Sequence, residues 1–184
     1  MTDAYTALIH SDRVSAKTRE ALLERAEPDA ADYTPEAMDA VAFATLRAVL
    51  ARVLPQDRID IAQRIDKALN TGESDGWRFA VLPTDAQGYA ESLTALAGFG
   101  EQPVAAQDRL LDAIAAGDRG EPLQRWFEDM RGQATMIYVS HPSTFARMGY
   151  SGIGYGGDEA RRPGFVAIAA NEREAWEPVP EITP

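Results

Sequence analysis

The sequence predicts an all-α fold: an irregular bundle of about five to six helices with an N-terminal arm and an extended, Gly/Pro-rich C-terminal strap. Three observations predict it. Apolar residues recur at intervals of three and four along much of the chain. Each of these stretches is bounded by a capping residue, a proline or a glycine. No run of alternating apolar and polar residues competes with them, so strands are not expected.

Three consecutive parts are expected along the chain. Residues 1–33 form a polar N-terminal arm, in which Ser15 to Ala26 predicts a short helix. Residues 34–148 form the helical domain. Residues 149–184 form a Gly/Tyr-rich loop and an extended C-terminal strap, because their last stretch holds too many prolines for a helix.

The helical domain opens with two predicted helices. The first starts at Thr34, whose hydroxyl can cap a helix, with Pro35 at the first helical position, and it ends before Pro55. The second runs from Asp60 and stops at Gly72. Their apolar residues recur at helical spacing and comprise Phe43, Leu46, Val49, Leu50 and Val53, followed by Ile61, Ile65 and Leu69.

Three further helices complete the predicted domain. One begins near Thr84 and ends before Gly98, and the next follows Pro103 and breaks at Gly117. The fifth helix has the most regular apolar stripe and ends at His141. The residues predicted to form the core are Phe43, Leu46, Leu111, Ile114, Trp126, Phe127, Met130 and Ile137.

Charge and composition exclude several classes of function. The formal net charge is −11, so the chain has no reserve of basic residues for nucleic acid or for an anionic membrane surface. It has no cysteine, which removes disulfides, thiolate catalysis and thiolate metal sites. No stretch of about 18 apolar residues occurs, so direct membrane insertion is not expected.

Two motifs are candidates for chemistry. The stretch from Gly152 to Gly157 matches G-x-G-x-x-G, but a helix rather than a strand precedes it, and Asp158 follows where a phosphate would lie. His141 has Ser140 and Ser143 as neighbours, yet a cationic cap on the end of the fifth helix is the simpler interpretation. No Glu-x-x-His metal motif occurs. We therefore expect no catalytic, cofactor-binding or metal-binding residue in this chain.

Aromatic and arginine residues outside the helical stripes are candidates for a partner interface, because tryptophan, tyrosine and arginine anchor protein interfaces. Those residues are Trp77, Arg78, Tyr150, Tyr155, Arg162 and Trp176.

Several short motifs follow one another over residues 34–177. They are Thr34 to Glu36, Phe43 to Arg47, Arg52 to Pro55, Arg64 to Asp66, Gln107 to Leu111, Trp126 to Arg131, Tyr138 to Pro142, Gly149 with Tyr150, Arg162 to Gly164, and Glu172 to Glu177. In this order they resemble the gluconate 2-dehydrogenase subunit 3 family, the small subunits of flavin-dependent sugar and alcohol dehydrogenases.

The resemblance implies a non-catalytic helical subunit without a cofactor of its own. Its partner would be a large FAD-binding subunit of the glucose–methanol–choline type, which oxidises a sugar, a sugar derivative or another alcohol. Many relatives carry a twin-arginine export signal, and residues 1–33 hold none. A cytoplasmic complex is therefore expected, and a periplasmic one only if the partner carries the signal. The alternative is a standalone small-molecule-binding or hydrolytic protein that uses His141 and the glycine-rich loop.

Overall fold

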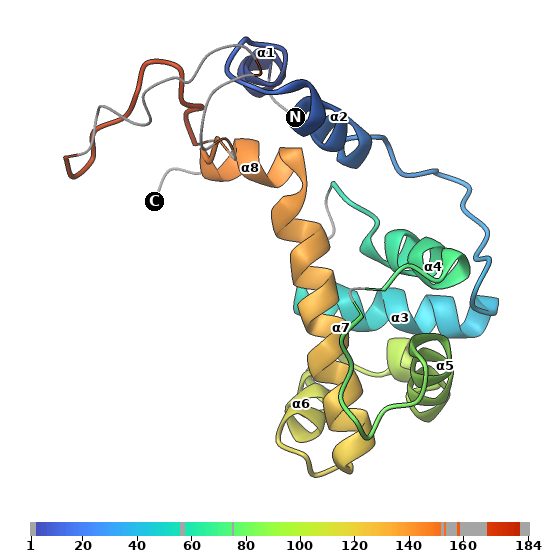
Figure 1. Ribbon diagram of the computed structural model, residues 1–184. Coiled ribbons are helices and arrows are strands. Elements are labelled where there is room, and N and C mark those ends of the chain that lie inside the picture. Colours follow the sequence, from blue (N-terminus) through green and yellow to red (C-terminus); the bar gives the residue numbers. More distant parts are fainter. Residues whose placement is uncertain are drawn as a thin grey trace. The chain divides into compact units, whose positions relative to one another are not determined.

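The computed structural model describes residues 3–55, 58–74, 76–151, 153, 158 and 169–180 (Figure 1). These residues form eight α-helices and one short 3-10 helix, with no β-strand among them, so the predicted all-α class is confirmed. In chain order the helices are α1 (Asp3–Ile9), α2 (Ala16–Arg25), α3 (Ala40–Val53), α4 (Ile61–Thr71), α5 (Asp85–Ala95), η1 (Phe99–Glu101), α6 (Val104–Ala115), α7 (Glu121–Ser140) and α8 (Pro142–Met148).

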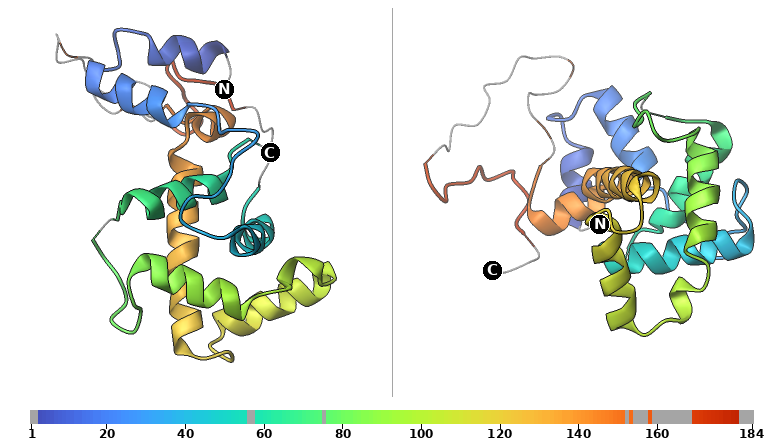
Figure 2. Two further views of the ribbon diagram at one scale, coloured as in Figure 1. Left: turned by 90° about the vertical axis from the view of Figure 1, so that its right-hand side faces the viewer. Right: turned by 90° about the horizontal axis from the view of Figure 1, so that it is seen from below.

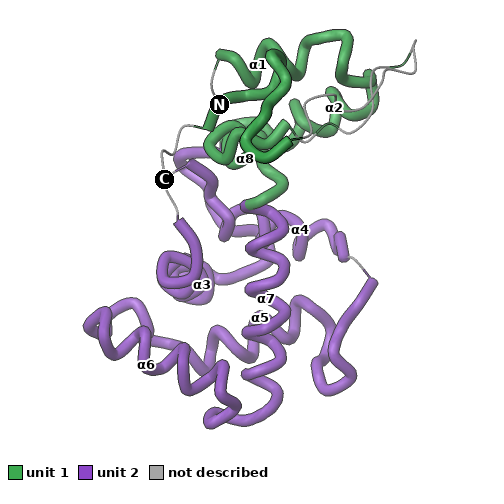
Figure 3. Tube along the Cα trace, turned by 90° about the vertical axis from the view of Figure 1, so that its left-hand side faces the viewer, with its two compact units in different colours: residues 1–28, 139–184 green, residues 29–138 purple. Residues whose placement is uncertain are grey.

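The chain divides into two compact units (Figure 3). Unit 1 consists of residues 1–28 together with residues 139–184, and unit 2 consists of residues 29–138. Most of the predicted arm and the whole of the predicted loop and strap therefore belong to the same unit. The two ends of the chain thus build one unit, and the contiguous stretch between them in the sequence builds the other.

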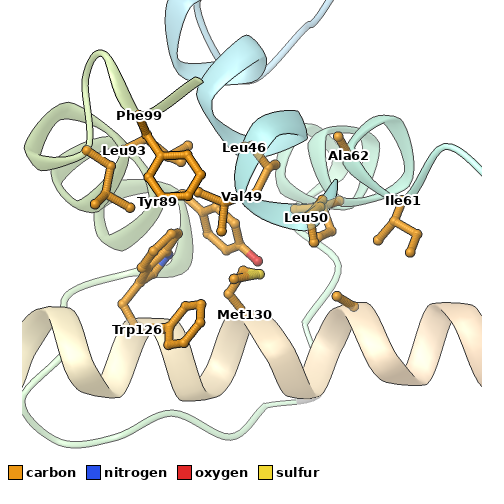
Figure 4. Packing of buried hydrophobic residues seen from close by; sticks show 14 of the residues in the cluster. Leu46, Val49, Leu50, Ile61, Ala62, Tyr89, Leu93, Phe99, Trp126 and Met130 are labelled. Atoms are coloured by element: carbon orange, nitrogen blue, oxygen red, sulfur yellow. The ribbon is translucent and has the colours of Figure 1, made fainter. Parts of the chain in front are cut away.

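The core of unit 2 is centred on α3, the most apolar of its helices, which contacts α4, α5, α6 and η1. The part of α7 in this unit passes alongside these helices (Figures 1 and 2). Trp126 and Met130 of α7 face the apolar residues of α3 and α5 (Figure 4). Tyr89 packs edge-on against Trp126, with ring centroids 5.6 Å apart. Seven of the eight predicted core residues are buried, and the eighth, Ile137, is partly buried against the same cluster.

The ends of α4 to α7 lie close to the predicted positions. Asp60 precedes α4 and accepts a hydrogen bond from the backbone N–H of Gln63 at 3.1 Å. Gly72 ends α4 in the left-handed conformation, with φ of 72°. Thr84 and Pro103 precede α5 and α6 as expected.

The start of α3 differs from the prediction, which placed it at Thr34. The N-cap is Asp39, whose carboxylate accepts the backbone N–H of Ala42 at 2.8 Å. Residues 36–38 instead turn toward the fully buried carboxylate of Asp66 on α4. That carboxylate accepts the backbone N–H groups of Glu36 at 2.7 Å and Met38 at 2.9 Å, and the hydroxyl of Tyr33 at 2.7 Å. A long-range partner therefore holds the N–H groups that a helix starting at Thr34 would have used.

Unit 1 contains two helices that the sequence did not predict, α1 and α8, each of seven residues. They share a small core with α2, formed by Tyr5, Leu8, Ile9, Val14, Leu22, Ala146 and Ile153. The Tyr5 hydroxyl donates to the backbone oxygen of Ser151 at 2.9 Å. Burial raises the pKa of this phenol well above its usual value. The N-terminal segment is thus a folded part of a core rather than a polar arm.

Candidate functional site

The segment between α4 and α5 exposes aromatic and apolar side chains on unit 2. Together with Arg125 of α7 they form a cluster here called the Trp77 patch: Trp77, Phe79, Val81 and Arg125. The Trp77 side chain is 56% exposed and packs edge-on against Phe79, with ring centroids 4.6 Å apart. The guanidinium carbon of Arg125, on α7, lies 4.8 Å from the centre of the Phe79 ring. Val81 is also exposed. The patch combines the residue types that dominate the energetics of protein interfaces.

Contacts within unit 2 hold the Trp77 patch in place. Arg125 forms an ion pair with Glu128 at 2.9 Å and a longer one with Glu121 at 3.9 Å. The backbone N–H of Leu82 donates to the Phe79 carbonyl at 2.9 Å, and the Leu82 side chain packs on the core. The patch is therefore presented on a supported turn. The predicted interface residue Arg78 lies beside it, 3.8 Å from Asp85, without joining the aromatic stack.

A second exposed cluster lies on unit 1, here called the Tyr150 patch: Phe145, Met148 and Tyr150. The Tyr150 side chain is 57% exposed and packs edge-on against Phe145, with centroids 5.2 Å apart. The backbone N–H of Tyr150 donates to the Phe145 carbonyl at 2.9 Å, which fixes the chain as it leaves α8. Met148 is also exposed.

Trp176 has a different environment from the other predicted interface residues. Its ring is partly buried against the small core of unit 1, and the guanidinium carbon of Arg13 lies 4.5 Å from its centroid. Arg173 donates to the carbonyls of Gly149 and Pro178, which ties this segment to the end of α8. Trp176 therefore anchors the C-terminal segment within its own unit. The remaining predicted interface residues, Tyr155 and Arg162, lie outside the described residues.

His141 is the N-cap of α8. Its Nδ1 accepts the backbone N–H of Ser143 at 3.1 Å and lies 2.6 Å from the Ser143 hydroxyl oxygen. The structure therefore places His141 as the cap at the start of α8, whereas the sequence predicted a cap on the end of the preceding helix. Only 7% of His141 and 4% of Ser143 are exposed, so both side chains serve the turn into α8.

A hollow of about 400 Å³ lies on unit 2, between the end of α5, one face of α6 and the first turn of α7. Two arginines, Arg109 and Arg119, line it together with apolar side chains. Neither arginine was among the predicted interface residues. Their separation of ten positions gives no helical or strand pattern that would connect them in the sequence.

Within the described ranges, no group of three or more histidine, aspartate or glutamate side chains is arranged to hold a metal ion. No described helix combines the length and apolar character needed to cross a bilayer.

Comparison with known proteins gives one match. The family model described as Gluconate 2-dehydrogenase subunit 3 matches residues 40–157, more than half of the chain. The matched region begins at the first residue of α3 and includes α8 and the Tyr150 patch. Neither a curated protein nor a solved structure matches.

Proposed function

The chain belongs to the gluconate 2-dehydrogenase subunit 3 family, and from this premise we propose that it is a non-catalytic small subunit that stabilises or matures a large FAD-binding dehydrogenase subunit. The partner would be of the glucose–methanol–choline type and would oxidise a sugar, a sugar derivative or another alcohol. The flavin and the group that removes the substrate proton would belong to that partner, and no residue of this chain is assigned to either.

The exposed aromatic clusters support the proposal. A protein that acts alone rarely exposes large apolar groups in clusters, because such groups favour association. Here Trp77 and Tyr150 are both more than half exposed, and each is braced by a second ring. A rigid aromatic anchor loses little conformational entropy when a partner covers it. The Trp77 patch and the Tyr150 patch are therefore the surfaces that we assign to the large subunit.

The test is co-expression of this chain, carrying the only affinity tag, with the large flavoprotein. The proposal requires a yellow, stoichiometric complex whose dehydrogenase activity depends on this chain. Trp77→Ala and Tyr150→Ala should each weaken the complex at least about tenfold, as expected for interface anchors. Val41→Ala is the matched control, because Val41 is exposed but lies outside both patches.

Two outcomes would contradict the proposal. A colourless chain that retains no flavoprotein would refute a role as its subunit. Flavoprotein that is active in the lysate only when this chain is co-expressed, but that does not co-purify with the tagged chain, would refute a permanent subunit and identify an assembly chaperone.

A further inference from the structure

The hollow on unit 2 combines an apolar floor with a charged rim. Leu96 is buried at its base, and Leu110 and Leu123 are partly buried beside it. Arg109 projects from α6, and Arg119 belongs to the turn between α6 and α7. The hollow is open to solvent on one side, so it suits the side chains of another protein better than a small molecule that needs enclosure.

The turn that carries Arg119 is tightly held. Gly117 and Gly120 flank it with φ of 86° and 95°, values that favour glycine. The backbone N–H of Asp118 donates to the Ala113 carbonyl at 2.9 Å, and the Gly120 N–H donates to the Gly117 carbonyl at 3.1 Å. The backbone of Arg119 is therefore fixed before any partner arrives.

Gln107 of α6 holds another part of the chain that lines the hollow. Its side-chain amide is almost fully buried and donates to the backbone carbonyl of Gln102 at 2.9 Å. It lies 3.4 Å from the carbonyl of Gly100 as well. Gln107 thus ties the segment that follows η1 to helix α6. Gln102, in that segment, itself lines the hollow. Contacts within unit 2 therefore hold the backbone next to Arg119 and at Gln102.

The two arginines have no partner among the described residues, although acidic side chains outnumber basic ones by 29 to 18 in the sequence. Asp112 follows Arg109 by three positions on α6, and Asp118 adjoins Arg119, yet neither carboxylate forms an ion pair with them. In contrast, Arg52 forms a two-point contact with a carboxylate on another helix, at 2.8 and 3.0 Å. The two guanidinium groups at the hollow are therefore available to carboxylates from outside the chain.

We propose that this hollow binds an acidic–apolar segment of the large subunit, with carboxylates on Arg109 and Arg119 and a leucine-sized side chain on the floor between them. The inference rests on the proposed function and assigns one specific contact to it. Guanidinium groups suit this role because their planar donors pair with carboxylates at two points and lose their hydration easily. On a chain of net charge −11, two guanidinium groups without a carboxylate partner among the described residues also specify where an acidic segment docks.

The test measures the affinity of the purified, flavin-loaded large subunit for the wild-type chain and for Arg109→Gln/Arg119→Gln. The double variant should bind about 10- to 100-fold more weakly, and its affinity should fall less steeply with salt. Lys17→Gln/Arg131→Gln is the control: it removes the same charge from exposed positions outside the hollow and should change affinity less than about threefold. Thermal melting of the isolated chains should show that both variants remain folded.

The possible results separate the two proposals. If the wild-type chain does not bind the flavoprotein, the proposed function fails. If the wild-type chain binds and the Arg109/Arg119 variant binds equally well, only the assignment of the hollow is overturned. Equal loss in the hollow variant and the control would indicate a general charge effect and would also overturn it. A variant that carries lysine at both positions should recover part of the affinity, since it keeps the charge but not the planar donors.

Discussion

Asp66→Asn tests how the segment that precedes α3 is held in unit 2. The substitution keeps the size of the side chain but removes its charge and replaces one acceptor oxygen by an NH₂ donor. In the structure both oxygens of Asp66 face donors only: the Tyr33 hydroxyl and the backbone N–H groups of Glu36, Ala37 and Met38. The NH₂ group of the new asparagine would therefore face other hydrogen-bond donors and could not bond to them.

The expected loss follows from the number of bonds. Three of the hydrogen bonds to Asp66 are 2.9 Å or shorter, and those to Ala37 are 3.3 and 3.4 Å. A hydrogen bond to a charged group contributes about 1.5–3 kcal/mol. Asparagine keeps one acceptor, so the variant should lose one or two short bonds and leave a buried donor unsatisfied. We expect the free energy of unfolding to fall by about 3–5 kcal/mol, a large share of the roughly 5–15 kcal/mol typical of a domain.

Urea denaturation followed by far-UV circular dichroism measures this loss. Asp108→Asn is the matched control, because Asp108 forms an exposed ion pair with Arg52 that lowers its pKa and should add little stability. A double-mutant cycle with Tyr33→Phe should give a coupling energy above about 0.5 kcal/mol, since the two side chains share a bond. A loss below about 1 kcal/mol in Asp66→Asn would refute the view that this carboxylate organises the segment.

Four further predictions concern other parts of the chain. Leu46→Ala should lower the free energy of unfolding by about 2–5 kcal/mol in urea denaturation, because Leu46 is fully buried in the core of unit 2. His141→Ala should cost about 1 kcal/mol of stability through loss of the α8 cap and leave the dehydrogenase activity of the complex unchanged. A hydrolytic activity of the isolated chain that this variant abolishes would instead favour the standalone alternative. Gly117→Ala should cost about 1–2 kcal/mol, measured by thermal melting, because its φ of 86° is strained for any residue with a Cβ. Burial raises the pKa values of Tyr5 and Tyr89. The stability that these neutral phenols contribute is fully present below the unfolded phenol pKa of about 10 and is lost as pH rises above it. Phenolate absorbance should show both tyrosines ionising only when the protein unfolds.

The helices of unit 2 could be predicted because their limits are set locally. Asp60, Thr84 and Pro103 precede helices for reasons contained within a few residues of each. The core residues of α7 could be identified from their spacing alone. The start of α3 could not, because Asp66, which holds the preceding turn, lies about thirty residues further along the chain. The predicted helix start at Thr34 agreed with the local signals, a capping hydroxyl followed by a proline at the first helical position.

The unpredicted features depend on contacts between distant residues. The helices α1 and α8 are too short, at seven residues each, for an apolar period to be recognised. The predicted role of Trp77 as an exposed anchor agrees with its 56% exposure, and binding itself stays a prediction. The sequence gives no sign of the hollow, since whether Arg109 and Arg119 meet a carboxylate depends on how α5, α6 and α7 pack.

The shared core of the two chain ends has a consequence for synthesis on the ribosome. The Tyr5 hydroxyl meets the Ser151 carbonyl across 146 positions, and at about 5–20 residues per second that interval lasts roughly 7–30 s. During this time α1 and α2 exist without the residues that cover their apolar side chains, while residues 29–138 already hold everything needed for their own core. Unit 2 should therefore fold first as the chain emerges, and unit 1 should close only at the end of translation. A chain truncated after residue 138 would therefore keep unit 2 but leave the apolar side chains of α1 and α2 without the C-terminal residues that cover them.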